Sequence, residues 1–174
     1  MRRTGPISKV SRVGLLSLLG IPGLCEKPDP IVGTWRPVQS TCLSTIAPKG
    51  VDCTHNDFWM TFHSDGTFVY SYHGGARADA GPEEVKVAEA MKVASEVPGT
   101  FKRGSDTLVT TSFPRKQREA FLAAGGPPSD APKDQAETSD SIVNYRLDGD
   151  ILETTWHSRD AEATTVDKYV RAAR

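Results

Sequence analysis

Short runs of alternating apolar and polar residues, separated by turn sequences, dominate the chain from residue 32 onward. Within 58–62 and 68–72, for example, every second position carries a large apolar or aromatic side chain. A period of two is the pattern of a β-strand that buries one face. The pattern predicts eight strands, at residues 32–38, 57–63, 67–73, 99–103, 106–113, 141–147, 150–158 and 163–172.

Three of the connections between these strands have the composition of tight hairpin turns. Residues 64–66 (SDG) suit a type I turn followed by a glycine in the left-handed region, which forms a G1 bulge. Residues 104–105 (GS) suit a type II′ turn, and residues 148–149 (DG) suit a type I′ turn. The sequence therefore predicts three antiparallel hairpins.

One face of each predicted hairpin is apolar and aromatic, and the other is mixed. The turns predict that Phe101 lies opposite Leu108 and that Tyr145 lies opposite Leu152. Such two-faced strands are what the wall of a barrel requires. The residues predicted to point inward are Phe58, Met60, Phe62, Phe68, Tyr70, Tyr72, Phe101, Leu108, Val143, Tyr145, Leu152 and Trp156.

The remaining connections, at 39–56, 74–98 and 114–140, are long, and they alternate with the tight turns. In an up-and-down barrel, alternate connections lie at opposite ends. We therefore predict one closed end, which holds the tight turns and both termini, and one mouth surrounded by long loops.

Two of the long loops have a recognisable character. Residues 82–97 predict a helix, because Pro82 and two glutamates begin it and Pro98 ends it. A second short helix is expected at 115–124. Residues 125–140 are rich in Gly, Pro, Ser and acidic residues, and we expect them to be disordered.

The N-terminal segment has the pattern of an export signal. Four basic residues precede the apolar run at 13–24 (VGLLSLLGIPGL). We therefore predict a signal peptide at 1–24, a linker at 25–31 and one domain at 32–172. The alternative is a basic leader followed by a short buried helix. Export implies a location in the periplasm, in the cell envelope or outside the cell.

Removing residues 1–24 takes away four basic residues and no acidic one, so the formal net charge moves from −1 to −5. A mildly acidic domain without a basic stripe argues against a nucleic-acid partner.

The three cysteines divide into a pair and one left over. Cys42 and Cys53 flank a single loop-like segment, and in an oxidising compartment they are expected to form a disulfide. Cys25 follows the apolar run, where a bacterial lipoprotein carries its lipidated cysteine, although Leu24 replaces the usual small residue. A free thiol, or loss with the signal peptide, is the alternative. A lipid anchor is the only membrane contact that the sequence suggests.

Several motifs in order along residues 31–172 resemble the lipocalins, and more closely the small bacterial lipocalin-like domains. They are GTW (33–35), FHSDGTFVY (62–70), GTFKRGSDTL (99–108), YRLDGDILETTW (145–156) and KYVR (168–171). The resemblance implies an all-β fold, an eight-stranded antiparallel up-and-down barrel. It also implies that an arginine of the last strand lies across the tryptophan of the first.

The order of the strands leads to the same contact. Trp35 begins the first strand and Arg171 ends the last, so closure of the barrel brings both to its closed end. Arg171 is then expected to stack on the indole, a contact that contributes about 0.5–2 kcal/mol. We interpret Gly33, Trp35 and Arg171 as a structural plug.

The sequence offers no pattern for catalysis or for a cofactor. It contains no nucleophile elbow, no phosphate-binding glycine loop and no HxH, HExxH or CxxC spacing. The four histidines, His55, His63, His73 and His157, are expected at the surface. We therefore expect a protein that is not an enzyme and that holds no metal.

The sequence is compatible with two functions. The first is the binding of a small hydrophobic or amphipathic ligand inside the barrel, by Phe58, Met60, Phe62, Phe68, Tyr70, Tyr72, Phe101, Tyr145 and Trp156. The second is a protein–protein module of the cell envelope, an accessory lipoprotein or a protease-inhibitor-like protein. Its barrel would be filled with side chains and hold no ligand.

Overall fold

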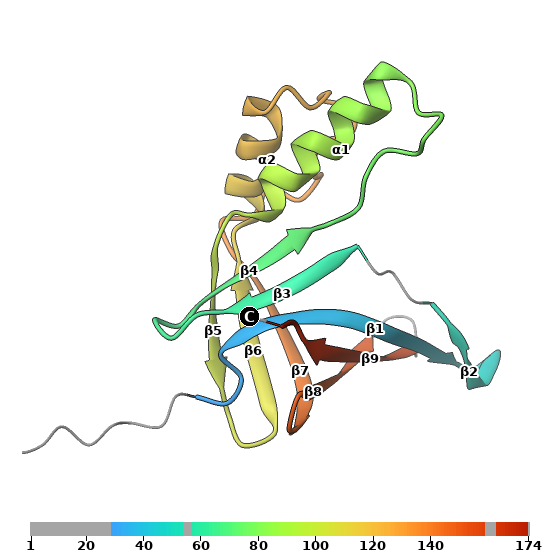
Figure 1. The fold of residues 1–174 in the computed structure, drawn as a ribbon, viewed down its shortest axis with the longest axis vertical. Coiled ribbons are helices and arrows are strands. Elements are labelled where there is room, and N and C mark those ends of the chain that lie inside the picture. The colour runs from blue at the N-terminus through green and yellow to red at the C-terminus, as the bar shows by residue number, and fades with distance from the viewer. Residues whose placement is uncertain (1–28, 54–56, 159–162, 174) are drawn as a thin grey trace, which may run out of the picture.

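The alternating segments form antiparallel strands in the computed structural model, which describes residues 29–53, 57–158 and 163–173 (Figure 1). The strands are β1 (Gly33–Ser44), β2 (Ala47–Asp52), β3 (Phe58–Phe62), β4 (Thr67–Tyr72), β5 (Gly99–Arg103), β6 (Thr107–Ser112), β7 (Ser139–Asp148), β8 (Ile151–Ser158) and β9 (Ala163–Arg171). The helices are α1 (Pro82–Ser95) and α2 (Pro114–Ala123).

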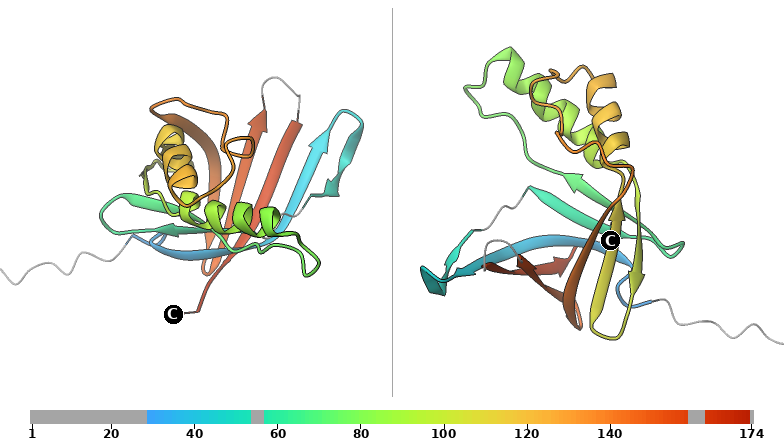
Figure 2. Two further views of the ribbon diagram at one scale, coloured as in Figure 1. Left: turned by 90° about the horizontal axis from the view of Figure 1, so that it is seen from above. Right: turned by 180° about the vertical axis from the view of Figure 1, so that it is seen from behind.

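Strands β1 and β3–β9 close into an eight-stranded antiparallel barrel, as the sequence predicted. Neighbouring strands pair in the order β1-β3-β4-β5-β6-β7-β8-β9, and β1 closes the ring by pairing with β9 over most of its length. Seen from three directions, the strands curve around one interior, and α1 and α2 lie over part of one end (Figures 1 and 2).

The long connection predicted at 39–56 is partly strand, which corrects the sequence analysis. Strand β1 continues to Ser44, and β2 turns back and pairs with its far end. A disulfide between Cys42 and Cys53 joins the two ends of this hairpin. The short polar sequence of β2 lacks the alternation of a buried strand, because β2 lies outside the closed barrel.

The first hairpin has the predicted register, whereas the other two are shifted by two residues. Met60 lies opposite Tyr70, and Gly66 has the positive φ of its bulge. Phe101, however, lies opposite Thr110 rather than Leu108, because residues 104–107 form a longer turn closed by a hydrogen bond from the Gly104 amide to the Thr107 carbonyl.

In the hairpin of β7 and β8 the turn is Gly149-Asp150, not Asp148-Gly149. Tyr145 therefore lies opposite Thr154 rather than Leu152. Gly149, whose φ is +58°, occupies the first position of this two-residue turn, whereas the sequence placed it at the second. Because side chains alternate with a period of two, a shift of two residues leaves every side chain on its predicted face.

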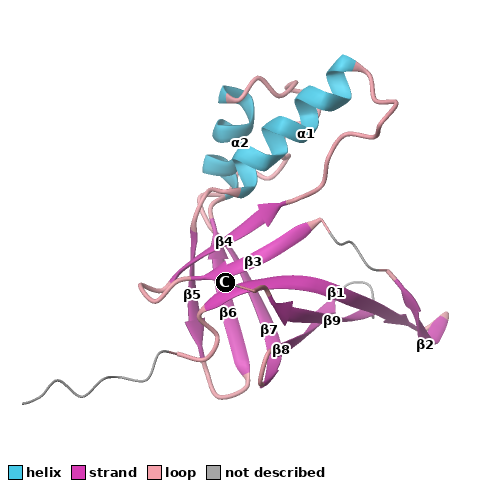
Figure 3. Cartoon of the chain, viewed as in Figure 1, coloured by secondary structure: helices cyan, strands magenta, loops and turns pink. Residues whose placement is uncertain are grey.

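The helices lie in the two longest connections, as predicted, and together form a helical cap (Figure 3). Strands β4 and β5 pair only near the closed end. Beyond that point the C-terminal end of α1 lies beside β4, and the Tyr72 amide donates a hydrogen bond of 2.8 Å to Ser95 Oγ.

The helical cap has a small core of its own, made of Ala90, Ala94, Phe121 and Ala131. Ala131 lies within 125–140, which we expected to be disordered. Its burial against the helices and the start of β7 at Ser139 show that part of this segment is ordered. The composition of the segment does not reveal that Ala131 joins the buried cluster around Phe121.

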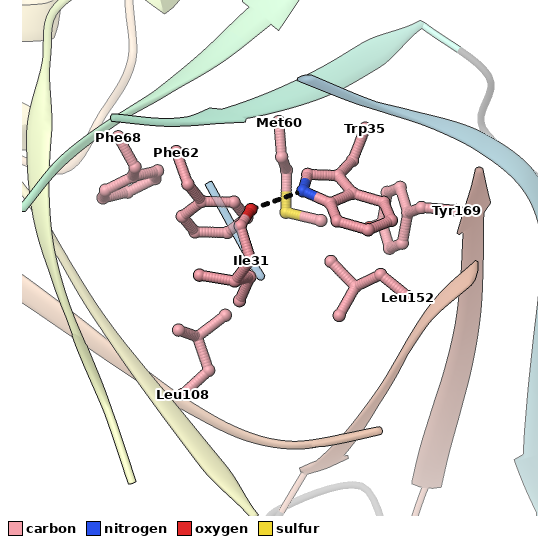
Figure 4. Close-up of a cluster of buried hydrophobic side chains, with 8 residues drawn as sticks. All are labelled: Ile31, Trp35, Met60, Phe62, Phe68, Leu108, Leu152 and Tyr169. Carbon is pink, nitrogen blue, oxygen red and sulfur yellow. Dashed lines mark hydrogen bonds between the residues drawn. The ribbon is translucent and has the colours of Figure 1, made fainter. Parts of the chain in front are cut away.

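The main core occupies the closed end of the barrel (Figure 4). Its buried residues are Ile31, Trp35, Met60, Phe62, Phe68, Leu108, Leu152 and Tyr169. Ile31 is fully buried, although the sequence analysis placed it in a linker. The ordered domain therefore begins before residue 32.

Candidate functional site

The plug predicted from the sequence is present. Trp35 and Arg171 are paired across β1 and β9, and the guanidinium carbon lies 4.2 Å from the centre of the indole ring. Trp35 is fully buried, and its Nε1–H donates a hydrogen bond of 2.8 Å to the Ile31 carbonyl (Figure 4). The indole is thus fixed both by stacking and by a hydrogen bond.

The guanidinium also fastens the chain that precedes β1. Arg171 Nη1 donates to the Val32 carbonyl at 2.8 Å, and Nη2 donates to the Pro30 carbonyl at 2.6 Å. Nε forms an ion pair of 3.0 Å with Asp150 in the turn between β7 and β8. Arg171 therefore ties three separate segments together and seals the closed end.

Gly33 makes room for this arrangement. Its φ is +140°, and a Cβ at this position would lie 2.5 Å from Arg171 Nη1. The G-x-W spacing thus has a local cause: the glycine lets the backbone pass close beneath the guanidinium, and the tryptophan two residues later receives it.

Above the core, the barrel contains a cavity of about 410 Å³, called the main cavity here. This volume lies within the range of sites that bind small molecules. Its apolar lining consists of Met60, Phe68, Leu108, Val143 and Trp156. Its hydroxyl-bearing lining consists of Tyr70, Thr110, Ser112, Ser141, Thr154 and Thr165, and Asp167 completes it.

A side cavity of about 290 Å³ adjoins the main cavity and shares Tyr70, Thr165 and Asp167 with it. The disulfide of Cys42 and Cys53 forms part of its wall. A third hollow, of about 210 Å³, lies between the barrel and the helical cap, where Met91 of α1 and Gln117 of α2 face Tyr70. Tyr70 therefore stands where the three spaces meet.

The hydroxyls of Tyr70, Tyr169 and Thr154 form a hydrogen-bonded group beside these cavities. Burial raises the pKa of Tyr169, and the neighbouring Tyr70 and Asp167 raise it further. Burial also raises the pKa of Tyr70. Tyr70 nevertheless keeps 37% of its surface accessible, because it is surrounded by protein but faces the cavities. Both phenols are neutral hydrogen-bonding groups at neutral pH.

The nine side chains predicted to bind a ligand fall into two groups. Phe58, Met60, Phe68, Tyr70 and Trp156 line the cavities. Phe62, Phe101 and Tyr145 instead pack at the closed end, while Tyr72 packs against Phe58 with its ring centre 5.1 Å away.

The polar half of the lining was not predicted from the sequence, because hydrophobic alternation marks only the apolar inward positions. The missed side chains are Thr110, Ser112, Ser141, Thr154, Thr165 and Asp167. Strand geometry could have identified them, because residues an even number of positions apart in a strand point to the same face. Asp167, for example, is four residues before Arg171 and therefore points to the same side.

The remaining predicted features are placed as follows. The disulfide is formed, with its Cα atoms 5.9 Å apart. Cys25 and His55 lie outside the described residues. His73 stacks on Trp59, with ring centres 4.2 Å apart, and His157 contacts Thr164. Across residues 29–53, 57–158 and 163–173, no group of three His, Cys, Asp or Glu side chains is arranged to hold a metal ion.

In the described part of the chain, neither helix is long and apolar enough to cross a lipid bilayer. A scan against protein-family models finds no match, and a search of curated proteins finds no significantly similar sequence. The likeness to lipocalins therefore rests on the closed antiparallel barrel and on the stacked Trp35 and Arg171.

Proposed function

We propose that this protein is an exported, lipocalin-like barrel that binds a small hydrophobic or amphipathic molecule in its interior and has no catalytic activity. The main cavity carries the proposal. One end of the barrel is sealed by the plug and the core, whereas the residues above the core leave about 410 Å³ unfilled. A barrel filled by its own side chains would leave no such space.

The lining supports binding rather than catalysis. It combines apolar floor residues with hydroxyls, and none of the residues that line the three cavities is a histidine or a free thiol. Hydroxyls and aromatic rings orient a ligand without activating it. The disulfide between Cys42 and Cys53 is compatible with an oxidising, exported location.

Native mass spectrometry of the purified protein tests the proposal, with Thr110→Phe as the variant that fills the main cavity. Val109→Phe is the matched control, because Val109 is adjacent but points to the other face of β6. We expect a bound small molecule on the wild type and on Val109→Phe, and its loss from Thr110→Phe. Equal occupancy of all three would place the ligand elsewhere.

One observation favours a protein-binding module as the second candidate. Ile46 at the tip of the β1–β2 hairpin has 94% of its surface exposed, and the disulfide braces that hairpin. A large apolar side chain on a rigid projection suits a protein contact. Under this alternative, the wild type would recover one stoichiometric partner from native envelope extracts and Ile46→Asp would not. Recovery of a small molecule alone would argue against it.

A further inference from the structure

Asp167 is the one charged residue among the side chains that line the main and side cavities. It lies on β9, opposite Thr154 of β8 and opposite Ser40 of β1. Its carboxylate is therefore held by two neighbouring strands at the middle of the barrel, one level closer to the mouth than the core residues Leu152 and Tyr169.

No cationic side chain neutralises this carboxylate in the described residues. The ion pairs found there join other acidic groups, such as Glu153 with Lys168 on the outer face of β8 and β9. Asp167 interacts electrostatically with the phenols of Tyr70 and Tyr169, which are neutral and whose ionisation it opposes. Asp167 is half-buried in the cavity wall, where a charge attracts an opposite charge more strongly than it does in bulk water.

The lining around Asp167 is also divided by polarity along the barrel axis. Toward the closed end, Met60, Phe68 and Leu108 form an apolar floor. One level up, Thr154 lies opposite Asp167 across β8 and β9, and Tyr70, whose phenol interacts electrostatically with Asp167, lines the same cavity. A molecule that matches both levels has an apolar body and one positively charged, hydrogen-bond-donating group.

We propose that the barrel selects a cationic amphiphile, an alkylamine-type ligand whose ammonium group pairs with Asp167 while its apolar part contacts Met60, Phe68 and Leu108. This inference rests on the proposed function and specifies the ligand class of the same cavity. An ammonium group has three donors and no acceptor, which suits a carboxylate flanked by hydroxyl oxygens. A fatty acid, by contrast, would bring a second negative charge to Asp167.

Calorimetric titration with three probes of equal chain length tests the charge preference. The probes are octylamine, which is protonated at neutral pH, 1-octanol and octanoate, each below the concentration at which it forms aggregates. We expect octylamine to bind about tenfold or more tightly than octanol, because hydrogen bonds to charged groups are the stronger ones, and octanoate to bind most weakly.

Asp167→Asn isolates the carboxylate, because the amide has nearly the same shape. We expect this variant to bind octylamine only as tightly as octanol, with its octanol affinity unchanged. Asp148→Asn is the matched control, since it removes the same charge from an exposed position outside the barrel and should leave all three affinities as in the wild type. Loss of the preference in the control would point to net charge rather than to Asp167.

A second measurement on the wild type does not depend on any substitution. Intermolecular NOEs should connect the α-methylene of octylamine to the Thr154 and Thr165 methyls, and its terminal methyl to Met60 and Leu108. Binding of octanol with no preference for octylamine, or a preference for octanoate, would overturn this inference and leave the proposed function standing. Failure of all three probes to bind would overturn both.

Discussion

At the scale of single residues, the structure rests on a contact between residues near opposite ends of the chain. Trp35 is fully buried under Arg171, and the guanidinium is held in place by the carbonyls of Pro30 and Val32. The stacking and these hydrogen bonds share one guanidinium group. We therefore expect cooperative stabilisation at this site, because loss of the guanidinium removes both the stacking and the hydrogen bonds that fasten the segment before β1.

A double-mutant cycle measures this coupling. Trp35→Ala should lower the free energy of unfolding by about 3–5 kcal/mol, because it leaves a large cavity in the core. Arg171→Ala should also destabilise, and the double variant should lose less than the two single variants combined, by about 0.5–2 kcal/mol. Chemical denaturation provides the three values. Strict additivity would mean that the stacking contributes nothing to stability.

The buried phenols predict a loss of stability in alkaline solution. Because the pKa of Tyr169 is raised above its ordinary value of 10.0 in the folded protein, the unfolded chain releases that proton first as the pH rises. The stabilisation is thus complete below pH 10 and decreases above it. Tyr169→Phe should have a flatter dependence of unfolding free energy on pH in this window. Identical slopes for the two proteins would show that Tyr169 ionises normally.

At the scale of elements, the sequence predicts the strands and their faces better than it predicts their partners. Alternation placed Phe101 and Tyr145 inside correctly, although their hairpins are shifted by two residues. A register shift of two preserves faces, so the hydrophobic pattern alone cannot detect it. Detection requires the turn: the Gly104 amide bonds to Thr107, and the conformation of Gly149 selects one of two adjacent turns.

Strand β2 and the ordered part of 125–140 escaped prediction for a different reason. Neither segment buries a regular apolar stripe of its own. Strand β2 is held by pairing with β1 and by the disulfide, and Ala131 is held by contact with the helical cap. A segment that is ordered by contacts with neighbouring elements cannot be recognised from its own composition.

In the candidate site, too, the hydrophobic pattern predicted the apolar residues but not the polar ones. The apolar wall was predictable, since Met60, Phe68 and Tyr70 alternate along β3 and β4. Asp167 was overlooked because a carboxylate on an inward position contradicts the expectation of an apolar core. A local conflict of this kind is expected at functional sites, where a binding requirement takes precedence over stability.

At the scale of the whole molecule, the two ends of the barrel differ in how they are closed. The plug and a continuous core close one end, whereas the helical cap, which has a separate small core, lies over only part of the other (Figure 2). Along its outer half, β4 contacts α1 rather than β5. The hollow of about 210 Å³ that includes Met91 and Gln117 lies between the cap and the barrel, and Tyr70 joins it to the main cavity, so displacement of the cap would widen access to the interior from this side.

This separation predicts that the cap opens without unfolding of the barrel. Phe121 is fully buried in the core of the cap, so Phe121→Ala should speed hydrogen exchange in α1 and α2 while the amides of β1 and β9 near the plug keep wild-type protection. Trp35→Ala is the comparison, because it weakens the common core and should speed exchange throughout the barrel. If the cap controls access, Phe121→Ala should also accelerate association and dissociation of octylamine with little change in affinity. Stopped-flow tryptophan fluorescence would record these rates, because Trp156 lines the main cavity, and a Trp156→Phe variant would identify its share of the signal. Exchange that rises equally in the cap and at the plug would show that barrel and cap unfold as one unit.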